Sequence, residues 1–174
     1  MRTSVLITAV GLAATLATGG AAASKARHGS QPIYGAFTIL SKKGTLTTRR
    51  CNGYQVTTAT YTGTSTSPDP RLAGSATVVP KIAVFPGSGT GFVTGTLVIR
   101  DPRRRIHLRS TLTGVVTNRT VVNGLVRGTL MSPSALLLAN VTIVFDTEYR
   151  FGAVRLGLES GQNSAVAYTP LKGC

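Results

Sequence analysis

The sequence predicts an all-β domain, a single antiparallel meander of about eight to ten strands that closes, fully or partly, into a small barrel. Apolar and polar residues alternate along several runs, and turn-forming residues recur about every 8 to 14 residues. The links between runs are short, which favours antiparallel pairing of neighbouring strands. Closing the sheet would remove its exposed edges, and an open β-sandwich is the alternative.

The first half of the chain is expected to form four strands, at residues 33–40, 45–50, 54–66 and 73–85. Because proline cannot donate to a strand ladder, Pro80 makes the fourth run an edge strand, a bulge or two short strands. Six further strands are expected at residues 92–100, 106–117, 120–131, 135–145, 149–158 and 164–168. Residues 132–139 could instead form one or two helical turns that begin at Ser132.

The run 106–117 carries the clearest alternation, with one apolar face and one polar face: Ile106, Leu108, Leu112 and Val116 against His107, Arg109, Thr111 and Thr113. Such a strand has one buried and one solvated side, as antiparallel sheets do. Glycines inside the expected strands favour sharp curvature and hence a barrel: Gly95, Gly114, Gly124, Gly128 and Gly152.

The N-terminus predicts export. A single charge, Arg2, precedes an apolar run that ends in small residues, the pattern of a signal peptide over residues 1–23. Residues 24–31 are then a flexible leader, and residues 32–174 form the barrel-like domain. No apolar stretch of the mature chain is long enough to be a transmembrane segment. The expected location is therefore secreted, either extracellular or associated with the cell envelope.

An oxidising destination gives the 2 cysteines a meaning, because cysteines of secreted proteins commonly pair. We expect a disulfide between Cys51 and Cys174, the last residue of the chain. Such a bond would close a loop of 174 − 51 = 123 positions and would hold the C-terminus.

Charge gives the strongest functional indication. The chain has 19 Lys and Arg against 5 Asp and Glu, a net charge of +14, and its 42% hydrophobic content excludes a disordered chain. Basic residues cluster at 42–43, at 49–50 and at 100–105. The candidate binding residues are Arg100, Arg103, Arg104, Arg105, His107 and Arg109. Arginine outnumbers lysine by 14 to 5, which favours a GC-rich bacterial source.

An exported cationic surface predicts an anionic partner, either a cell-envelope polymer or lipid headgroups. Nucleic acid is disfavoured because no aromatic residues interleave with the basic clusters. A small apolar ligand inside the barrel is a further possibility. No cofactor, metal site or catalytic residue is expected, because the acidic residues fall in or beside predicted turns and no ligand set is present.

The sequence thus favours a non-enzymatic binding protein. One alternative is a small barrel enzyme of the cyclase or isomerase type, with His107, Glu148 or Tyr149 inside the barrel. The other alternative is a structural or inhibitory secreted module.

Overall fold

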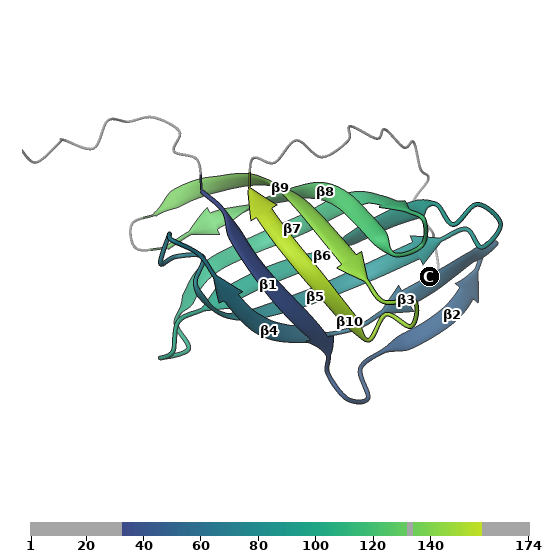
Figure 1. Cartoon of the computed structure of the whole chain (residues 1–174), viewed down its shortest axis with the longest axis horizontal. Coiled ribbons are helices and arrows are strands. Elements are labelled where there is room, and N and C mark those ends of the chain that lie inside the picture. The colour runs from purple at the N-terminus through teal and green to yellow at the C-terminus, as the bar shows by residue number, and fades with distance from the viewer. Residues whose placement is uncertain (1–32, 132–133, 158–174) are drawn as a thin grey trace, which may run out of the picture. The chain divides into compact units, whose positions relative to one another are not determined.

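The computed structural model describes residues 33–131 and 134–157, which form ten antiparallel strands and, in this part of the chain, no helix (Figure 1). The strands are β1 (Gly35–Ser41), β2 (Thr47–Cys51), β3 (Tyr54–Thr58), β4 (Tyr61–Thr66), β5 (Gly74–Val84), β6 (Gly91–Arg100), β7 (Ile106–Thr117), β8 (Val121–Leu130), β9 (Ala135–Phe145) and β10 (Phe151–Gly157). The predicted all-β class is confirmed. The expected signal peptide, the leader, the strand at 164–168 and Cys174 lie outside the described residues.

Eight of the strands close into a barrel. From β5 the hydrogen-bonded order runs β4, β1, β10, β9, β8, β7 and β6, and β6 pairs again with β5. The β2–β3 hairpin lies outside this ring and joins it where β3 pairs with β5. The predicted barrel is therefore confirmed, and the alternative of an open sandwich is wrong.

The expected single strand 54–66 is two strands, with a break at Ala59 and Thr60. β3 and β4 follow one another along the same edge of β5, but β3 pairs with β2 on its other side whereas β4 pairs with β1. At this break the chain passes from the outer hairpin into the barrel wall, a tertiary change that local alternation does not encode.

Pro80 does not interrupt β5, which runs unbroken through eleven residues. The Pro80 carbonyl accepts a hydrogen bond from Ala59 N–H at 3.4 Å. Because the N–H and C=O of one strand residue point to the same edge, the missing donor of Pro80 faces the break between β3 and β4. The proline therefore costs no ladder bond to β6, with which β5 stays paired.

The helical alternative at 132–139 is wrong for residues 135–139, which belong to β9.

Inward side chains fill the barrel with apolar groups. They form one buried cluster that includes Ile39, Leu97, Leu108, Val126 and Ile143. At one end Tyr61, Phe145 and Tyr149 pack ring against ring, and the Tyr61 hydroxyl donates to the Tyr149 carbonyl at 2.5 Å. A second, smaller cluster under the outer hairpin contains Val56, Ala83 and Phe92 and packs against Cys51 and Tyr54.

Gly124 shows how the sheet bends tightly enough to close. It lies opposite Gly114 in the β7–β8 ladder. A Cβ on Gly124 would lie 2.2 Å from the Thr113 carbonyl oxygen and 2.7 Å from the Gly114 Cα. No side chain fits there, so the two backbones approach and coil as a curved sheet requires. This close approach agrees with the curvature expected from the strand glycines.

In the described part of the chain no helix is long and apolar enough to cross a membrane.

Candidate functional site

Asp101 organises the turn between β6 and β7, which we name the arginine turn (residues 101–105). Its side chain is 7% exposed and accepts the Arg105 backbone N–H at 2.8 Å and the Arg105 Nε–H at 2.7 Å. Backbone bonds close the same turn, from Asp101 N–H to the Arg105 carbonyl and from Arg104 N–H to the Asp101 carbonyl. One carboxylate thus holds the turn while the neighbouring guanidinium groups face solvent.

A β-bulge brings His107 into this turn. Ile99 pairs with Leu108, but Arg100 pairs with Ile106, so β7 carries one extra residue at this point. Bulges of this kind change the direction of a side chain at the end of a ladder. His107 Nε2 lies 3.4 Å from Asp101 Oδ2, and Nδ1 lies 3.3 Å from the Pro70 carbonyl oxygen. The His107 ring therefore contacts an acceptor on each side, the Asp101 carboxylate and the Pro70 carbonyl.

The loop between β4 and β5 forms the facing wall. Asp69 accepts the backbone N–H of Arg71 at 2.9 Å and pairs with its guanidinium at 2.6 Å. The following residue, Leu72, is 1% exposed and belongs to the main core cluster. The loop is therefore held by an ion pair on its outer side and by an apolar anchor on its inner side.

A cleft of about 440 Å³ opens between this loop and the arginine turn. Pro70, Ala73 and Gly74 line one side, and the other side is lined by Asp101, Pro102, Arg103, Arg105 and His107. Gly74 has a φ of +135°, and a Cβ there would lie 2.0 Å from the Arg100 carbonyl oxygen. Only glycine allows the backbones of β5 and β6 to approach this closely at the edge of the cleft.

The cleft is electropositive. The pKa of Asp101 lies below its ordinary value: burial alone would raise it, but the hydrogen bonds from Arg105 and the charges of Arg105 and His107 outweigh burial. Asp101 therefore carries its negative charge at neutral pH, and that charge is matched by Arg105. Arg103 and Arg104 are exposed and form no ion pair within the described residues. Their guanidinium groups can pair bidentately with phosphate or carboxylate.

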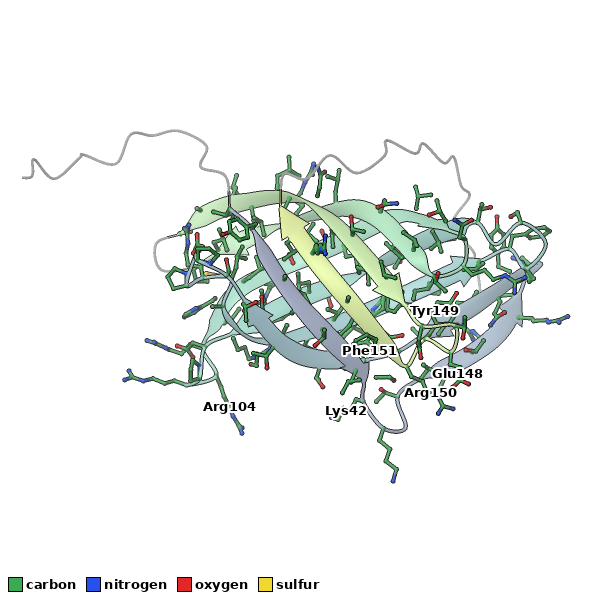
Figure 2. All side chains as sticks on the ribbon, viewed as in Figure 1. Lys42, Arg104, Glu148, Tyr149, Arg150 and Phe151 are labelled. Carbon is green, nitrogen blue, oxygen red and sulfur yellow. The ribbon has the colours of Figure 1, made fainter. Side chains whose placement is uncertain are left out.

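The structure brings together most of the six candidate binding residues. Arg103, Arg105 and His107 line the cleft, and Arg104 projects from the tip of the turn (Figure 2). Arg100 ends β6, partly buried, next to the turn. Arg109 is exposed on the outer face of β7, two residues beyond His107.

The other basic segments lie elsewhere. Lys42 and Lys43 follow the far end of β1, in a turn closed by Thr45, and Arg49 and Arg50 are on the outer strand β2. Figure 2 shows Lys42 and Arg104 projecting from separate parts of the barrel. The three basic clusters of the sequence therefore do not form one surface.

The candidate acid–base groups do not meet inside the barrel. His107 lies on the outside at the arginine turn, whereas Glu148 and Tyr149 are in the turn between β9 and β10. Glu148 is 63% exposed and pairs with Arg150, and the buried Tyr149 donates its hydroxyl hydrogen to the Arg119 carbonyl at 2.5 Å. Burial raises the pKa of Tyr149, which keeps the phenol protonated.

Every carboxylate of the described residues serves its own turn. Asp69 and Asp101 pair with arginines two and four residues later, and Glu148 pairs with Arg150. Asp146 accepts backbone N–H groups of Arg150 and Phe151. The described residues contain no cluster of three or more metal-ligating side chains.

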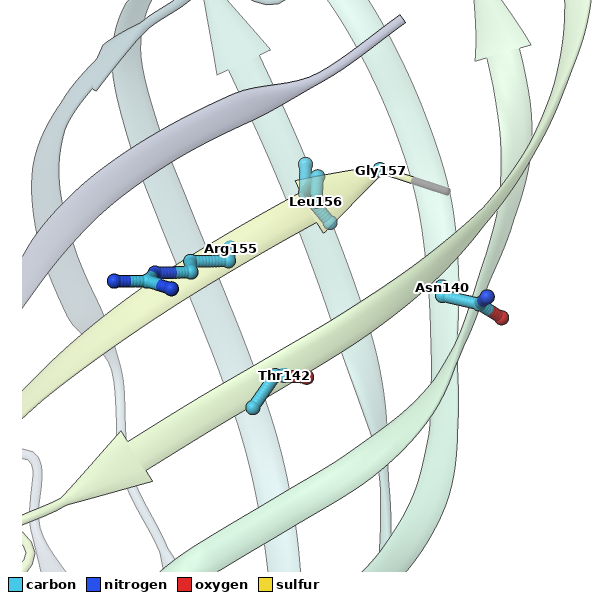
Figure 3. A pocket seen from close by; sticks show the side chains of 5 residues that line it. All are labelled: Asn140, Thr142, Arg155, Leu156 and Gly157. Atoms are coloured by element: carbon cyan, nitrogen blue, oxygen red, sulfur yellow. The ribbon is translucent and has the colours of Figure 1, made fainter. Parts of the chain in front are cut away.

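A second recess lies between β9 and β10, lined by Asn140, Thr142, Arg155, Leu156 and Gly157 (Figure 3). It has a volume of about 10 Å³, which is room for about one water molecule. Its size excludes it as a ligand site.

Comparison with known proteins adds no relative. No family model, curated protein or solved structure matches the chain.

Sequence reasoning assigned Asp101 to turn chemistry but missed that it also faces His107 across the bulge. It likewise missed the β4–β5 loop as the second wall of the cleft. An inserted residue in a ladder has no local sequence signal here, and the contact of His107 with Pro70, across 37 positions, depends on barrel closure.

Proposed function

We infer that this protein is an exported, non-catalytic β-barrel that binds clustered phosphate or carboxylate groups of the cell envelope through the arginine turn and its cleft. These groups occur on anionic envelope polymers and on lipid headgroups, and the chemistry of recognition is the same for both. The observation that carries this proposal is the cleft itself: the buried Asp101 carboxylate holds the turn through Arg105, and Arg103 and Arg104 form no ion pair within the described residues.

Preorganisation supports the proposal. Holding a cationic turn in one conformation before binding reduces the entropy lost when an anion is bound. Asp101 provides that restraint through two hydrogen bonds to Arg105, and the Asp69–Arg71 pair restrains the opposite wall. Both walls of the cleft are therefore held by hydrogen bonds, and guanidinium groups lie on its rim.

Packing inside the barrel favours this outer site over a ligand in the lumen. Inward positions such as Ile39, Leu108 and Val126 are fully buried and fill the interior. An enzyme of the cyclase or isomerase type also lacks support, because His107 lies outside the wall at the start of β7, whereas Glu148 and Tyr149 lie in the turn after β9, at the other end of the strands.

Export and the disulfide are part of the same proposal. The signal-peptide pattern of residues 1–23 implies an oxidising destination, where Cys51 and Cys174 would form a disulfide. This bond would attach the end of the chain to the outer hairpin. An anionic envelope component is then the partner that the exported domain would meet.

Chromatography on phosphocellulose tests the site. At about 0.15 M salt, near physiological ionic strength, the mature protein should be retained, and Arg103→Ala with Arg104→Ala should elute at clearly lower salt. Arg105 is left in place because it is the partner of Asp101. The matched control is Lys42→Ala with Lys43→Ala. It removes the same charge from the turn that follows β1, away from the cleft.

Equal shifts in both double variants would mean that only net charge matters, and would overturn the assignment to the arginine turn. An unchanged elution of the arginine variant would do the same.

A further inference from the structure

Two leucines stand out on the outer wall of the barrel. Leu136 is 90% exposed and Leu138 is 63% exposed, both on β9 and both on its outward face. Their inward neighbours Leu137 and Ala139 are buried in the core, so the strand has its apolar side inside and places further apolar side chains outside. Isolated exposed leucines are common, but two on one strand face form a small apolar patch.

Cations flank this patch on the neighbouring strands. Leu138 lies directly opposite Arg127 of β8, and Leu136 lies opposite Thr129, whose partner on β7 is Arg109. Outward side chains of directly opposed residues lie about 5 Å apart. Arg127 and Arg109 are both exposed. Each leucine therefore has a guanidinium group within one or two strands of it on the same face.

This amphipathic face is continuous with the arginine turn. Arg109 lies two positions from His107 on the outward side of β7. The Met131 N–H, at the end of β8, donates to the His107 carbonyl at 2.8 Å, so the leucine-bearing end of β9 and the arginine turn belong to the same end of the wall.

We propose that this face docks on an anionic lipid bilayer, with Leu136 and Leu138 inserted at the level of the headgroups and with Arg109, Arg127 and the arginine turn on the lipid phosphates. The proposal rests on the proposed function and selects lipid as the source of the anionic groups. A soluble polyanion has no apolar part to cover the leucines, whereas a bilayer offers phosphate and hydrocarbon at adjacent depths.

A second copy of the chain fits this face less well. The flanking arginines would meet like charges across a symmetric contact, and the chain carries a net charge of +14. Charge complementarity therefore favours a partner that is negatively charged and apolar at once.

Vesicle co-sedimentation tests the proposal with the full mature chain. We expect binding to phosphatidylglycerol vesicles and at least tenfold weaker binding to phosphatidylcholine vesicles. The variant L136T/L138T keeps residues that favour strands and should bind phosphatidylglycerol at least tenfold more weakly, while its elution from phosphocellulose stays unchanged. L136F/L138F, which restores apolar side chains, should bind like the wild type.

The matched control is L40T/F151T. These two residues are also outward, apolar and paired with each other, with exposures of 59% and 42%. They lie where β1 ends and β10 begins, away from Leu136 and Leu138. Vesicle binding unchanged in L136T/L138T, or reduced equally in L40T/F151T, would overturn the lipid-docking face and leave the arginine-turn proposal intact. Loss of phosphocellulose binding in R103A/R104A without any vesicle dependence on the leucines would support the polymer alone.

Discussion

Asp101 is the residue on which the candidate site depends. Its carboxylate contacts two side chains of the β6–β7 connection, the Arg105 guanidinium and the His107 ring. A carboxylate in that position holds the turn only while it is ionised. Its role therefore predicts how stability depends on pH.

The variant Asp101→Asn should be less stable than the wild type near neutral pH, because the amide loses the charge that Arg105 and His107 face. The folded-state pKa of Asp101 is depressed, so its stabilising contribution is present above the ordinary value of about 4 and is lost as pH falls through the lower folded value. Urea unfolding should show a gap between variant and wild type that closes below about pH 4.

The exposed Glu148→Gln serves as the control, since an exposed ion pair contributes little. A gap for Asp101→Asn that stays constant down to about pH 2 would contradict the role given to its charge.

Arg104 holds a left-handed backbone conformation, with a φ of +63°, at the tip of the arginine turn. Residues with side chains disfavour this region, and such strain is tolerated where function requires it. Arg104→Gly should raise stability by about 0.5 to 1 kcal/mol and yet elute from phosphocellulose at lower salt than the wild type. Thermal unfolding measured alongside the chromatography checks both halves, and a variant that binds as tightly as the wild type would contradict the role of this side chain.

At the scale of elements, nine of the ten expected strands fall within the described residues or overlap them, and all nine are present, because alternation and turn residues mark them locally. It did not predict the break between β3 and β4 or the bulge at His107. Both are consequences of pairing with strands that are distant in sequence. Half of the candidate site, the turn itself, was therefore visible in advance, and the opposite wall with Pro70 and Gly74 was not.

The β7–β8 pair provides the element-scale prediction. Gly124→Ala should destabilise the fold by about 3 kcal/mol or more, because the new methyl group meets backbone atoms that cannot move aside without opening the ladder. Gly87→Ala is the control, since its Cβ would meet only the edge of the exposed Phe85 ring. Urea unfolding measures both variants, and a loss below about 0.5 kcal/mol for Gly124→Ala would contradict the close approach of the two strands.

At the scale of the whole molecule, an apolar barrel carries a cationic exterior and an outer hairpin with Cys51 next to its turn. We predict that Cys51 and Cys174 form a disulfide. Closing a loop of 174 − 51 = 123 positions would stabilise the fold by roughly 5 kcal/mol in the chain-entropy model.

Intact mass after alkylation without reductant should show no added alkyl groups, and reduction should lower the unfolding temperature. Two alkylated thiols in the unreduced protein would contradict the pairing.

The central claim is that the arginine turn, and not the overall charge, recognises anionic groups. Backbone amide NMR of the ¹⁵N-labelled mature protein, titrated with short-chain polyphosphate, tests it most directly. Shift changes should centre on residues 101–107 and on the facing residues 69–74, with small changes at the lysine turn 42–46. Changes that are spread evenly over all basic segments, or that centre on residues 42–50, would contradict it.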